Sequence, residues 1–290
     1  MTLRSAIRLT KSSAYYRFIY ILGRIVLMSL LILIGMIWAV PFAWILVSSI
    51  KPESEILTYP VRWIPNPVTF EHYAGVLNRF PLLDWLLNSA IVSVATVTIS
   101  TTVVSLGAYA LARMRFRGRS VIYLVILGSF LLPGEVMLVP LYLGFNKFHL
   151  LNSYFTLISV GIADAFNLFL LTQFFQTFPD ELEDAAYIDG CSRLDILWRI
   201  LLPLSKPALI TIILFRFFAT WNDFTWPLIA IDGDAYRTLP VGIVTFIARS
   251  MGMYYGIVMS GAVLACMPAL FIFFFLQRYF VQGIVTTGIK

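Results

Sequence analysis

Six long apolar runs constrain the fold of this chain more than any other feature of its sequence. An α-helix of about 20 apolar residues crosses the hydrocarbon core of a bilayer, which is roughly 30 Å thick. Hydrophobic residues make up 60% of the sequence and charged residues only 12%, well below the charged fraction that is usual in soluble domains. The sequence therefore predicts an all-α polytopic membrane protein with six transmembrane helices, at 26–50, 85–111, 121–145, 154–175, 207–229 and 257–280.

Lysine and arginine residues are distributed unequally between the two sides of this predicted bundle. Fourteen flank the runs on the side that carries both termini, and six lie on the other side. Because cytoplasmic flanks of membrane helices carry the excess of basic residues, both termini are predicted to be cytoplasmic. Residues 1–24 then form a cytoplasmic segment, and residues 25–290 form the transmembrane domain with external loops at 51–84 and 230–256. The net charge of +6 follows from this orientation, so nucleic acid is not expected as a partner.

Few residues in the chain suit catalysis or metal binding. The two cysteines, Cys191 and Cys266, lie far apart, and both histidines stand alone, so neither a disulfide nor a metal site is predicted. The sequence lacks the G-x-x-x-x-G-K-[ST] loop that cradles nucleotide phosphates. The first apolar run is longer than the apolar part of a signal peptide, so it is interpreted as a retained membrane helix. We expect neither an enzyme nor a cofactor bound to this chain.

The segment 179–207, between the fourth and fifth runs, is the most informative part of the sequence. Pro179 suits the start of a helix, and acidic residues follow in the first turn, where they favour the helix dipole. Gly190 stands at the expected end of this short helix, where a left-handed residue is typical. Ser192 and Asp195 match a short capping box for a second helix, which two prolines interrupt. The pattern predicts a helix–turn–helix on the cytoplasmic surface.

The same segment resembles the EAA loop of ABC importer permeases, whose pattern is E-A-A-x-x-D-G followed by I-x-L-P. Here the residues read D-A-A-Y-I-D-G at 184–190 and I-L-L-P at 200–203, with aspartate in place of the family's glutamate. The two alanines leave one face of the first helix nearly bare, so another protein could approach it closely. The resemblance implies that the segment docks on an ATPase subunit through Glu183, Asp184, Ala185, Ala186, Asp189, Gly190, Leu202 and Pro203.

Further motifs resemble the carbohydrate branch of this family, and in particular the smaller permease of maltose-type transporters. They are L-P-G-E at 132–135, W-N-D-F at 221–224 and the glycine-containing end at 280–288. The resemblance implies a type I ABC importer permease fold in the bacterial inner membrane. It also implies that the chain forms, with a second homologous permease, the path for a carbohydrate delivered by an extracellular binding protein. Two ATPase subunits would bind ATP and Mg²⁺ and drive alternating access.

Polar residues within the apolar runs have two interpretations. An ionised side chain at a helix centre costs about 2.5–3.5 kcal/mol on insertion scales, so each is expected to face protein or water. One interpretation is a polar translocation path, and the other is a set of buried pairs that lock the bundle. A third alternative, an ion-driven transporter, would use the carboxylates as a proton relay. The residues concerned are Glu135, Asp164, Asn167, Arg216, Thr220, Asn222 and Asp223. By helical spacing, Asp164 and Asn167 are expected on one face of the fourth span, and Arg216, Thr220 and Asp223 on one face of the fifth. Glu135 is expected beside a kink at Pro133 and Gly134.

Two more features have alternative interpretations. Trp221 and Trp226 suit either stacking against a sugar ring or a position at the membrane interface, where tryptophan is common. The external loop 230–256 is, by resemblance, the part that reaches the binding protein; otherwise it is an ordinary surface loop. Its expected tip consists of Arg249, Ser250, Met251, Gly252, Met253 and Tyr254.

Overall fold

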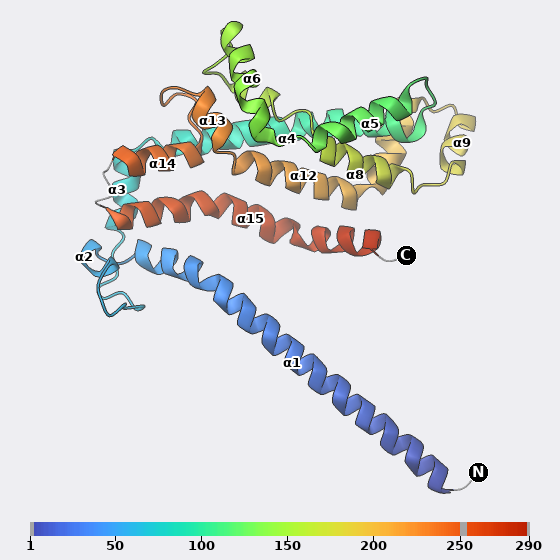
Figure 1. The fold of residues 1–290 in the computed structure, drawn as a ribbon, viewed down its shortest axis with the longest axis horizontal. Coiled ribbons are helices and arrows are strands. Elements are labelled where there is room, and N and C mark those ends of the chain that lie inside the picture. The colour runs from blue at the N-terminus through green and yellow to red at the C-terminus, as the bar shows by residue number, and fades with distance from the viewer. Residues whose placement is uncertain (1–2, 250–253, 289–290) are drawn as a thin grey trace. The chain divides into compact units, whose positions relative to one another are not determined.

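The protein is built from helices (Figure 1). The computed structural model describes residues 3–249 and 254–288, and all regular elements in these residues are helical, as predicted. Contacts divide the chain into two compact units, Met1–Tyr73 with Tyr254–Ser260, and Ala74–Met253 with Gly261–Lys290. The short helices are α2 (Glu53–Ile56), α3 (Glu71–Arg79), α9 (Glu181–Ile188), α10 (Arg193–Asp195), the π-helix η1 (Ile196–Leu201) and α11 (Leu202–Leu204).

Three helices in the described residues are long and apolar enough to cross a membrane. They lie within α1 (Leu3–Ser49), α4 (Leu82–Arg113) and α15 (Tyr255–Gly288). Two further pairs of helices pass the same test together but are sharply bent, which raises the number of candidate spans to five. The polytopic helical class is therefore established. The count of six spans and the cytoplasmic position of both termini stay predictions.

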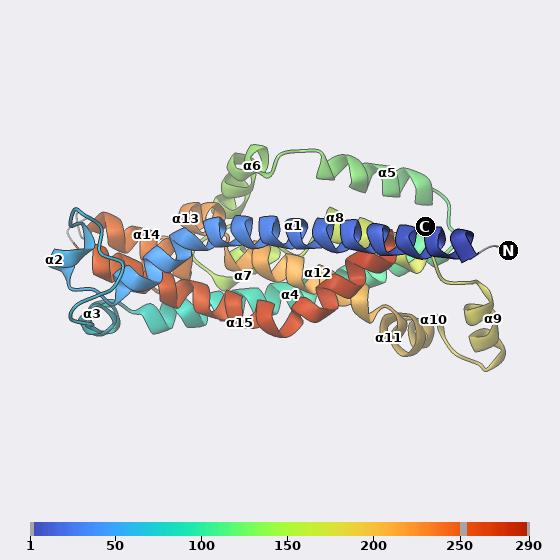
Figure 2. The same ribbon diagram turned by 90° about the horizontal axis from the view of Figure 1, so that it is seen from below.

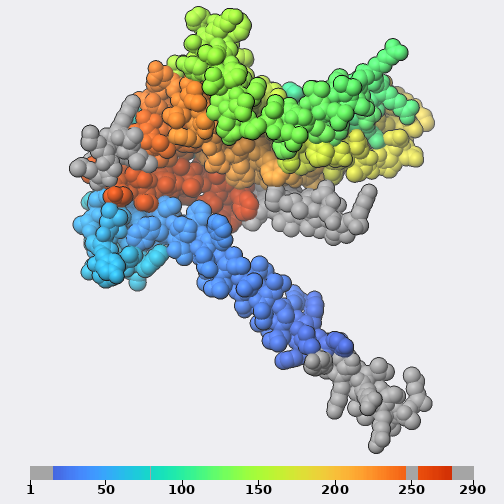
Figure 3. Space-filling view, viewed as in Figure 1, coloured from blue at the N-terminus to red at the C-terminus, as the bar shows by residue number. Residues whose placement is uncertain are grey.

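The third predicted span is two helices rather than one. α5 (Arg119–Phe130) and α6 (Gly134–Lys147) meet at an angle of 99°. Pro133 lacks an amide hydrogen and disfavours a helical conformation at Leu132, so the helix ends there. The kink expected at this proline is present, but it is a sharp turn. In Figures 1 and 3, α6 projects away from α4 and α12, and it contacts α13.

The fourth predicted span also breaks, between α7 (Tyr154–Ser159) and α8 (Ala165–Phe175). Gly161 lies in the break, and a Cβ there would meet the side chains of Thr96 and Arg216 at 2.5 and 2.6 Å. Asp164 begins α8 as its N-cap, because its Oδ1 accepts a hydrogen bond from Asn167 N at 2.9 Å. Asp164 therefore lies at the start of a helix, and not on the face of a continuous span as the sequence suggested.

The fifth predicted span ends at Trp221 in α12 (Lys206–Trp221), and α13 (Thr225–Ala230) begins four residues later. Asn222 Nδ2 donates to Phe218 O at 3.0 Å, and Asp223 Oδ1 accepts from Trp226 N at 3.4 Å. Short polar side chains of this kind offer the backbone partners that compete with a helix. Asp223 therefore lies beyond the helix that carries Arg216, which corrects the prediction of one shared face.

The core of the second unit lies where α4 packs against α8 and α12, which run beside it (Figure 2). Small residues of α4 permit this close approach, as is usual between membrane helices. Ala108 is fully buried, and a Cβ on Gly107 would already lie 3.0 Å from Leu168 Cδ1. The core includes Val104, Ala108, Tyr109, Leu171, Phe175 and Ile212.

The predicted external loop 230–256 contains a helix, α14 (Leu239–Arg249), which corrects its interpretation as a plain loop. α14 packs on α4 because its residues are largely apolar and because the Asn88 side chain of α4 holds the backbone that precedes α14. Asn88 Nδ2 donates to Ala235 O at 3.0 Å and to Arg237 O at 2.9 Å. A Cβ on Gly242 would lie 2.2 Å from the Trp85 ring, so the two elements touch closely.

The first unit contains a buried lysine within the predicted external loop 51–84. Lys51 is fully buried, and its Nζ lies 4.5 Å from the centroid of the Trp44 ring, a cation–π distance. His72 Nε2 lies 2.7 Å from Lys51 O, so this histidine has a structural partner. Glu53 accepts hydrogen bonds from the first two amides of α15, at 2.6 and 3.0 Å. These contacts hold the loop in a defined conformation.

Candidate functional site

The turn after α9 has the geometry that the sequence predicted. Asp189 is the C-cap of the helix, and Gly190 follows it with a φ of 81°. Gly190 N donates to Tyr187 O at 3.0 Å, which closes the turn. A Cβ at Gly190 would meet no atom within 4 Å, so the backbone conformation alone requires glycine.

A capping box begins the second helical part of the segment, as predicted. The Ser192 hydroxyl accepts from Asp195 N at 3.2 Å, and Asp195 Oδ2 accepts from Ser192 N at 3.2 Å. Hydrogen bonds from the Ser192 hydroxyl and amide lower the pKa of the Asp195 carboxyl below its ordinary value. The interruption expected at Pro203 and Pro207 is also present, since the stretch Arg193–Leu204 meets α12 at 86°.

One acidic residue of α9 faces its own chain. The Glu183 side chain exposes only 11% of its surface and pairs with Arg113 at the end of α4. Asp180, just before the helix, pairs with the same arginine at 3.0 Å. Sequence reasoning used Arg113 only as a marker of orientation and did not predict this contact. The acidic residues at the start of the predicted helix were the signal available in the sequence.

The two alanines of α9 face in different directions. Ala186 is buried in the core of the second unit, whereas Ala185 is exposed. Consecutive residues of a helix are about 100° apart, so both cannot lie on one flat surface. The predicted bare alanine face is therefore wrong for Ala186, which packs against its own chain. Ala185 remains available to a partner.

The outward surface of α9 combines exposed apolar and acidic side chains. Ile188 exposes 87% of its surface and Tyr187 44%. Asp184 and Asp189 are exposed beside them, as is Gly190. Of the two residues predicted further along, Pro203 is exposed, but Leu202 is buried in the core and cannot contact a partner. We call the exposed set Asp184, Ala185, Tyr187, Ile188 and Asp189 the α9 surface.

A polar cluster joins α8 to α12 in the middle of the second unit. Arg216 Nη1 lies 3.4 Å from Asp164 Oδ2, and Arg216 Nε donates to Thr220 Oγ1 at 3.2 Å. Asn167 is buried and donates through Nδ2 to Asp164 Oδ2 at 2.8 Å. The four predicted residues are thus brought together as a charge pair with two polar neighbours. A cavity of about 620 Å³ adjoins the pair, lined among others by Gly107, Ser129, Phe130 and Leu168.

The other three residues predicted for the path do not join this cluster. Glu135 is exposed in the first turn of α6. Asn222 is exposed at the end of α12, and Asp223 contacts the backbone of α13. Of the three carboxylates of the alternative proton relay, Glu135 lies apart, whereas Asp223 interacts electrostatically with Arg216, the partner of Asp164.

Both tryptophans are buried in the protein. Neither indole faces a sugar or the membrane interface, so neither predicted role applies to them. Trp221 Nε1 donates to Ala265 O at 3.4 Å, and Trp226 Nε1 donates to Thr156 O at 3.1 Å. Their exposed fractions are only 5% and 4%. Buried indoles that satisfy their N–H in this way serve as packing residues.

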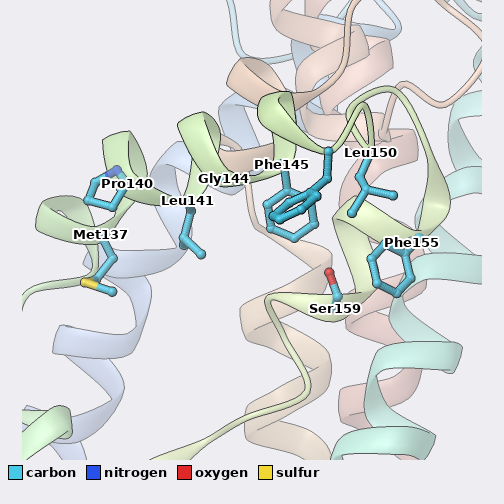
Figure 4. Close-up of a pocket in the computed structure, with 9 residues that line it drawn as sticks. Met137, Pro140, Leu141, Gly144, Phe145, Leu150, Phe155 and Ser159 are labelled. Atoms are coloured by element: carbon cyan, nitrogen blue, oxygen red, sulfur yellow. The ribbon is translucent and has the colours of Figure 1, made fainter.

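An apolar pocket of about 310 Å³ lies between α6 and the chain around α7. In Figure 4, the side chains of Leu141 and Phe145 extend from α6 toward the region that contains Phe155 and Ser159. Ser159 contributes the one hydroxyl group that lines the pocket, and aliphatic and aromatic groups form most of the remaining lining. The pocket lacks the polar groups that fix a sugar and is not assigned to the path.

The predicted tip of the external loop lies mostly outside the described residues. Arg249 is the last residue of α14, and Tyr254 is exposed directly before α15. Residues 250–253, which include Ser250, Met251, Gly252 and Met253, are not described. The role of this tip toward a binding protein stays a prediction.

These features define an all-helical, polytopic membrane component with an exposed α9 surface and a polar cluster between its helices. Residues 103–286 match the family described as binding-protein-dependent transport system inner membrane component. This match covers more than half of the chain, and the chain belongs to that family. It is the permease component of such a system, and the match places it in the inner membrane as a multi-pass protein.

The chain resembles several members along most of its length. It is 32% identical over 92% of its residues to the arabinooligosaccharides transport system permease protein AraQ of Bacillus subtilis (strain 168), covering 96% of that protein. It is 30% identical to the diacetylchitobiose uptake system permease protein DasC of Streptomyces coelicolor, over 90% of this chain and 95% of the relative. A chain of a bacterial ABC transporter that imports alginate has the same fold, with a TM-score of 0.79 and 27% identity over 88% of this chain and 95% of that one.

Proposed function

We propose that this permease carries a carbohydrate, such as a sugar, an oligosaccharide or a related polyol, across the bacterial inner membrane. Substrate would arrive on an extracellular binding protein and pass through a path shared with a second homologous permease. Two separate ATPase subunits would supply the energy through the segment 179–207. The relatives named for arabinooligosaccharides and diacetylchitobiose, and the alginate importer, support the carbohydrate class.

The α9 surface carries this proposal. It presents Ile188 almost fully exposed beside Asp184 and Asp189, on a helix whose other face is fixed in the protein core. Tyr187 and Ile188 are adjacent exposed apolar side chains with carboxylates beside them, and an apolar patch with a polar rim is typical of a contact with another protein. The partner surface would offer an apolar pocket with basic residues at its rim, which is the complement of this pattern.

The Asp164–Arg216 pair supports a polar path between helices. A charge pair within the membrane region is costly unless its members face each other, other polar groups or water. Here the pair adjoins a cavity, so its remaining oxygens and N–H groups could bind sugar hydroxyls. A path of this kind would use Asp164, Asn167, Arg216 and Thr220, while Glu135, Asn222 and Asp223 would act elsewhere or not at all.

The test uses the purified permease with its ATPase subunits. Ile188→Asp and Ala185→Glu should each release the ATPase during size-exclusion chromatography, because each places a charge in the apolar contact. Ile64→Asp is the matched control, since Ile64 is 82% exposed in the predicted external loop and should leave the complex intact. Retention of the ATPase in both α9 variants, with normal ATP-driven sugar uptake, would contradict the proposed docking surface.

A further inference from the structure

Arg113, the last residue of α4, contacts the chain before α9 and the first turn of α9 with every nitrogen of its guanidinium. Its Nε lies 2.5 Å from Glu183 Oε1. Its Nη1 donates to Phe178 O and lies close to Asp180 Oδ1, both at 3.0 Å. Its Nη2 donates to Pro179 O at 3.1 Å. One side chain thus binds two carboxylates and two backbone carbonyls around the start of the docking helix.

Burial makes this contact stronger than an ordinary surface ion pair. The Arg113 side chain exposes 6% of its surface and that of Glu183 exposes 11%. Water screens such a pair poorly, whereas it screens an exposed pair well. The planar guanidinium presents five donors in a fixed fork, so it can hold carbonyls and carboxylates at once; the ammonium of lysine cannot reproduce this geometry.

A second attachment lies one helical turn further along α9. Ala186 is buried in the same core as Tyr109 and Ala112 of α4 and Phe175 of α8. Glu183 and Ala186 are three residues apart, so they share one face of α9. That face is fixed to the end of α4, while the α9 surface points away from it.

We propose that Arg113 is a positioning residue for energy coupling, which makes α9 and α4 move as one body. Displacement of the α9 surface by an ATPase subunit would then reach α4 directly. α4 carries Thr96, and both Thr96 and Arg216 lie against Gly161, so the movement would extend to the polar cluster. This inference rests on the proposed docking function of segment 179–207.

The measurement is the number of sugar molecules taken up per ATP hydrolysed, by the complete transporter in proteoliposomes with its binding protein. Arg113→Ala should lower this ratio about tenfold, within the range by which substitutions in coupling elements act. Arg113→Lys should give an intermediate ratio. Arg117→Ala is the matched control, because it removes an exposed positive charge from the same connection and should leave the ratio unchanged.

Exchanging the charges of Arg113 and Glu183 distinguishes a positioning role of Arg113 from a general effect on stability. Arg113→Glu should uncouple the transporter, and combining it with Glu183→Arg should restore part of the ratio, because the buried pair re-forms without the two carbonyl contacts. A wild-type ratio in Arg113→Ala would overturn the proposal. If Arg113→Ala does not assemble, Arg113→Lys decides, since it keeps the positive charge and loses the fork of donors; a wild-type ratio there would overturn the proposal.

Failure of this inference can be distinguished from failure of the proposed function. If Ile188→Asp releases the ATPase while the Arg113 variants transport with the normal ratio, the docking surface stands and the positioning role of Arg113 falls. If Ile188→Asp also leaves assembly and uptake intact, the docking function itself is wrong.

Discussion

Gly190 is required for its backbone conformation, and this can be separated from crowding. Its φ is 81°, and a Cβ there would meet no atom within 4 Å. A left-handed conformation costs most L-residues about 1–2 kcal/mol, β-branched residues more, and asparagine least. Gly190→Val should therefore reduce ATP-coupled uptake strongly at normal membrane levels, whereas Gly190→Asn should retain most of it. Equal uptake in the two variants would show that the turn does not depend on this conformation.

The residue scale also shows what the sequence could not predict. The motif predicted the short helix α9 and the turn at Gly190 correctly, but it did not show which side of the helix faces its own chain. Ala185 and Ala186 looked equivalent, yet Ala185 is exposed and Ala186 is buried; Asp184 is likewise exposed, whereas Glu183 is buried. The choice depends on where α4 ends and on its Arg113, which is 70 residues away in the sequence. No local pattern contains that information.

At the scale of elements, apolar composition predicted where helices lie and overlooked where they break. Proline signalled the turn between α5 and α6, because Pro133 cannot continue the hydrogen-bond pattern of a helix. Pro227, in the first turn of α13, gives a similar signal near Asp223, whereas no proline accompanies the break beside Asp164. At both breaks the carboxylate accepts an amide hydrogen bond at a new helix start. Breaks inside a membrane region are tolerated when protein supplies the backbone partners, so hydropathy alone cannot locate them.

The capping box of the second docking helix gives a prediction at this scale. Ser192 accepts a hydrogen bond from Asp195 N, and a serine-to-alanine change at such a position costs about 1 kcal/mol. Ser192→Ala should therefore loosen the start of α10 and speed cleavage of the segment 179–207 by a protease added to detergent-purified protein. Ser192→Thr keeps a hydroxyl and should be cleaved as slowly as the wild type. Faster cleavage in both variants would assign the effect to packing.

For the whole molecule, the sequence predicted the class and the transport function because several spaced motifs agree along the chain. The family match and the relatives confirm the permease class. The number of spans was harder to predict, since the long helices α1, α4 and α15 account for three, and the remaining candidate spans are bent pairs. The substrate is harder still, because the described polar cluster contains hydrogen-bonding groups that fit many sugars.

Orientation in the membrane is the property of the whole molecule that a single experiment can test. The distribution of basic residues predicts that the connection after the fourth run is cytoplasmic and that the connection after the first run is external. Ile188 and Ile64 report on these two sides and are similarly exposed, at 87% and 82%. We replace Cys191 and Cys266 with serine and introduce Ile188→Cys or Ile64→Cys. A membrane-impermeant maleimide applied to right-side-out vesicles should then label the Ile64→Cys protein at once. It should label the Ile188→Cys protein only after permeabilisation, and the reverse order would mean that the predicted orientation is inverted.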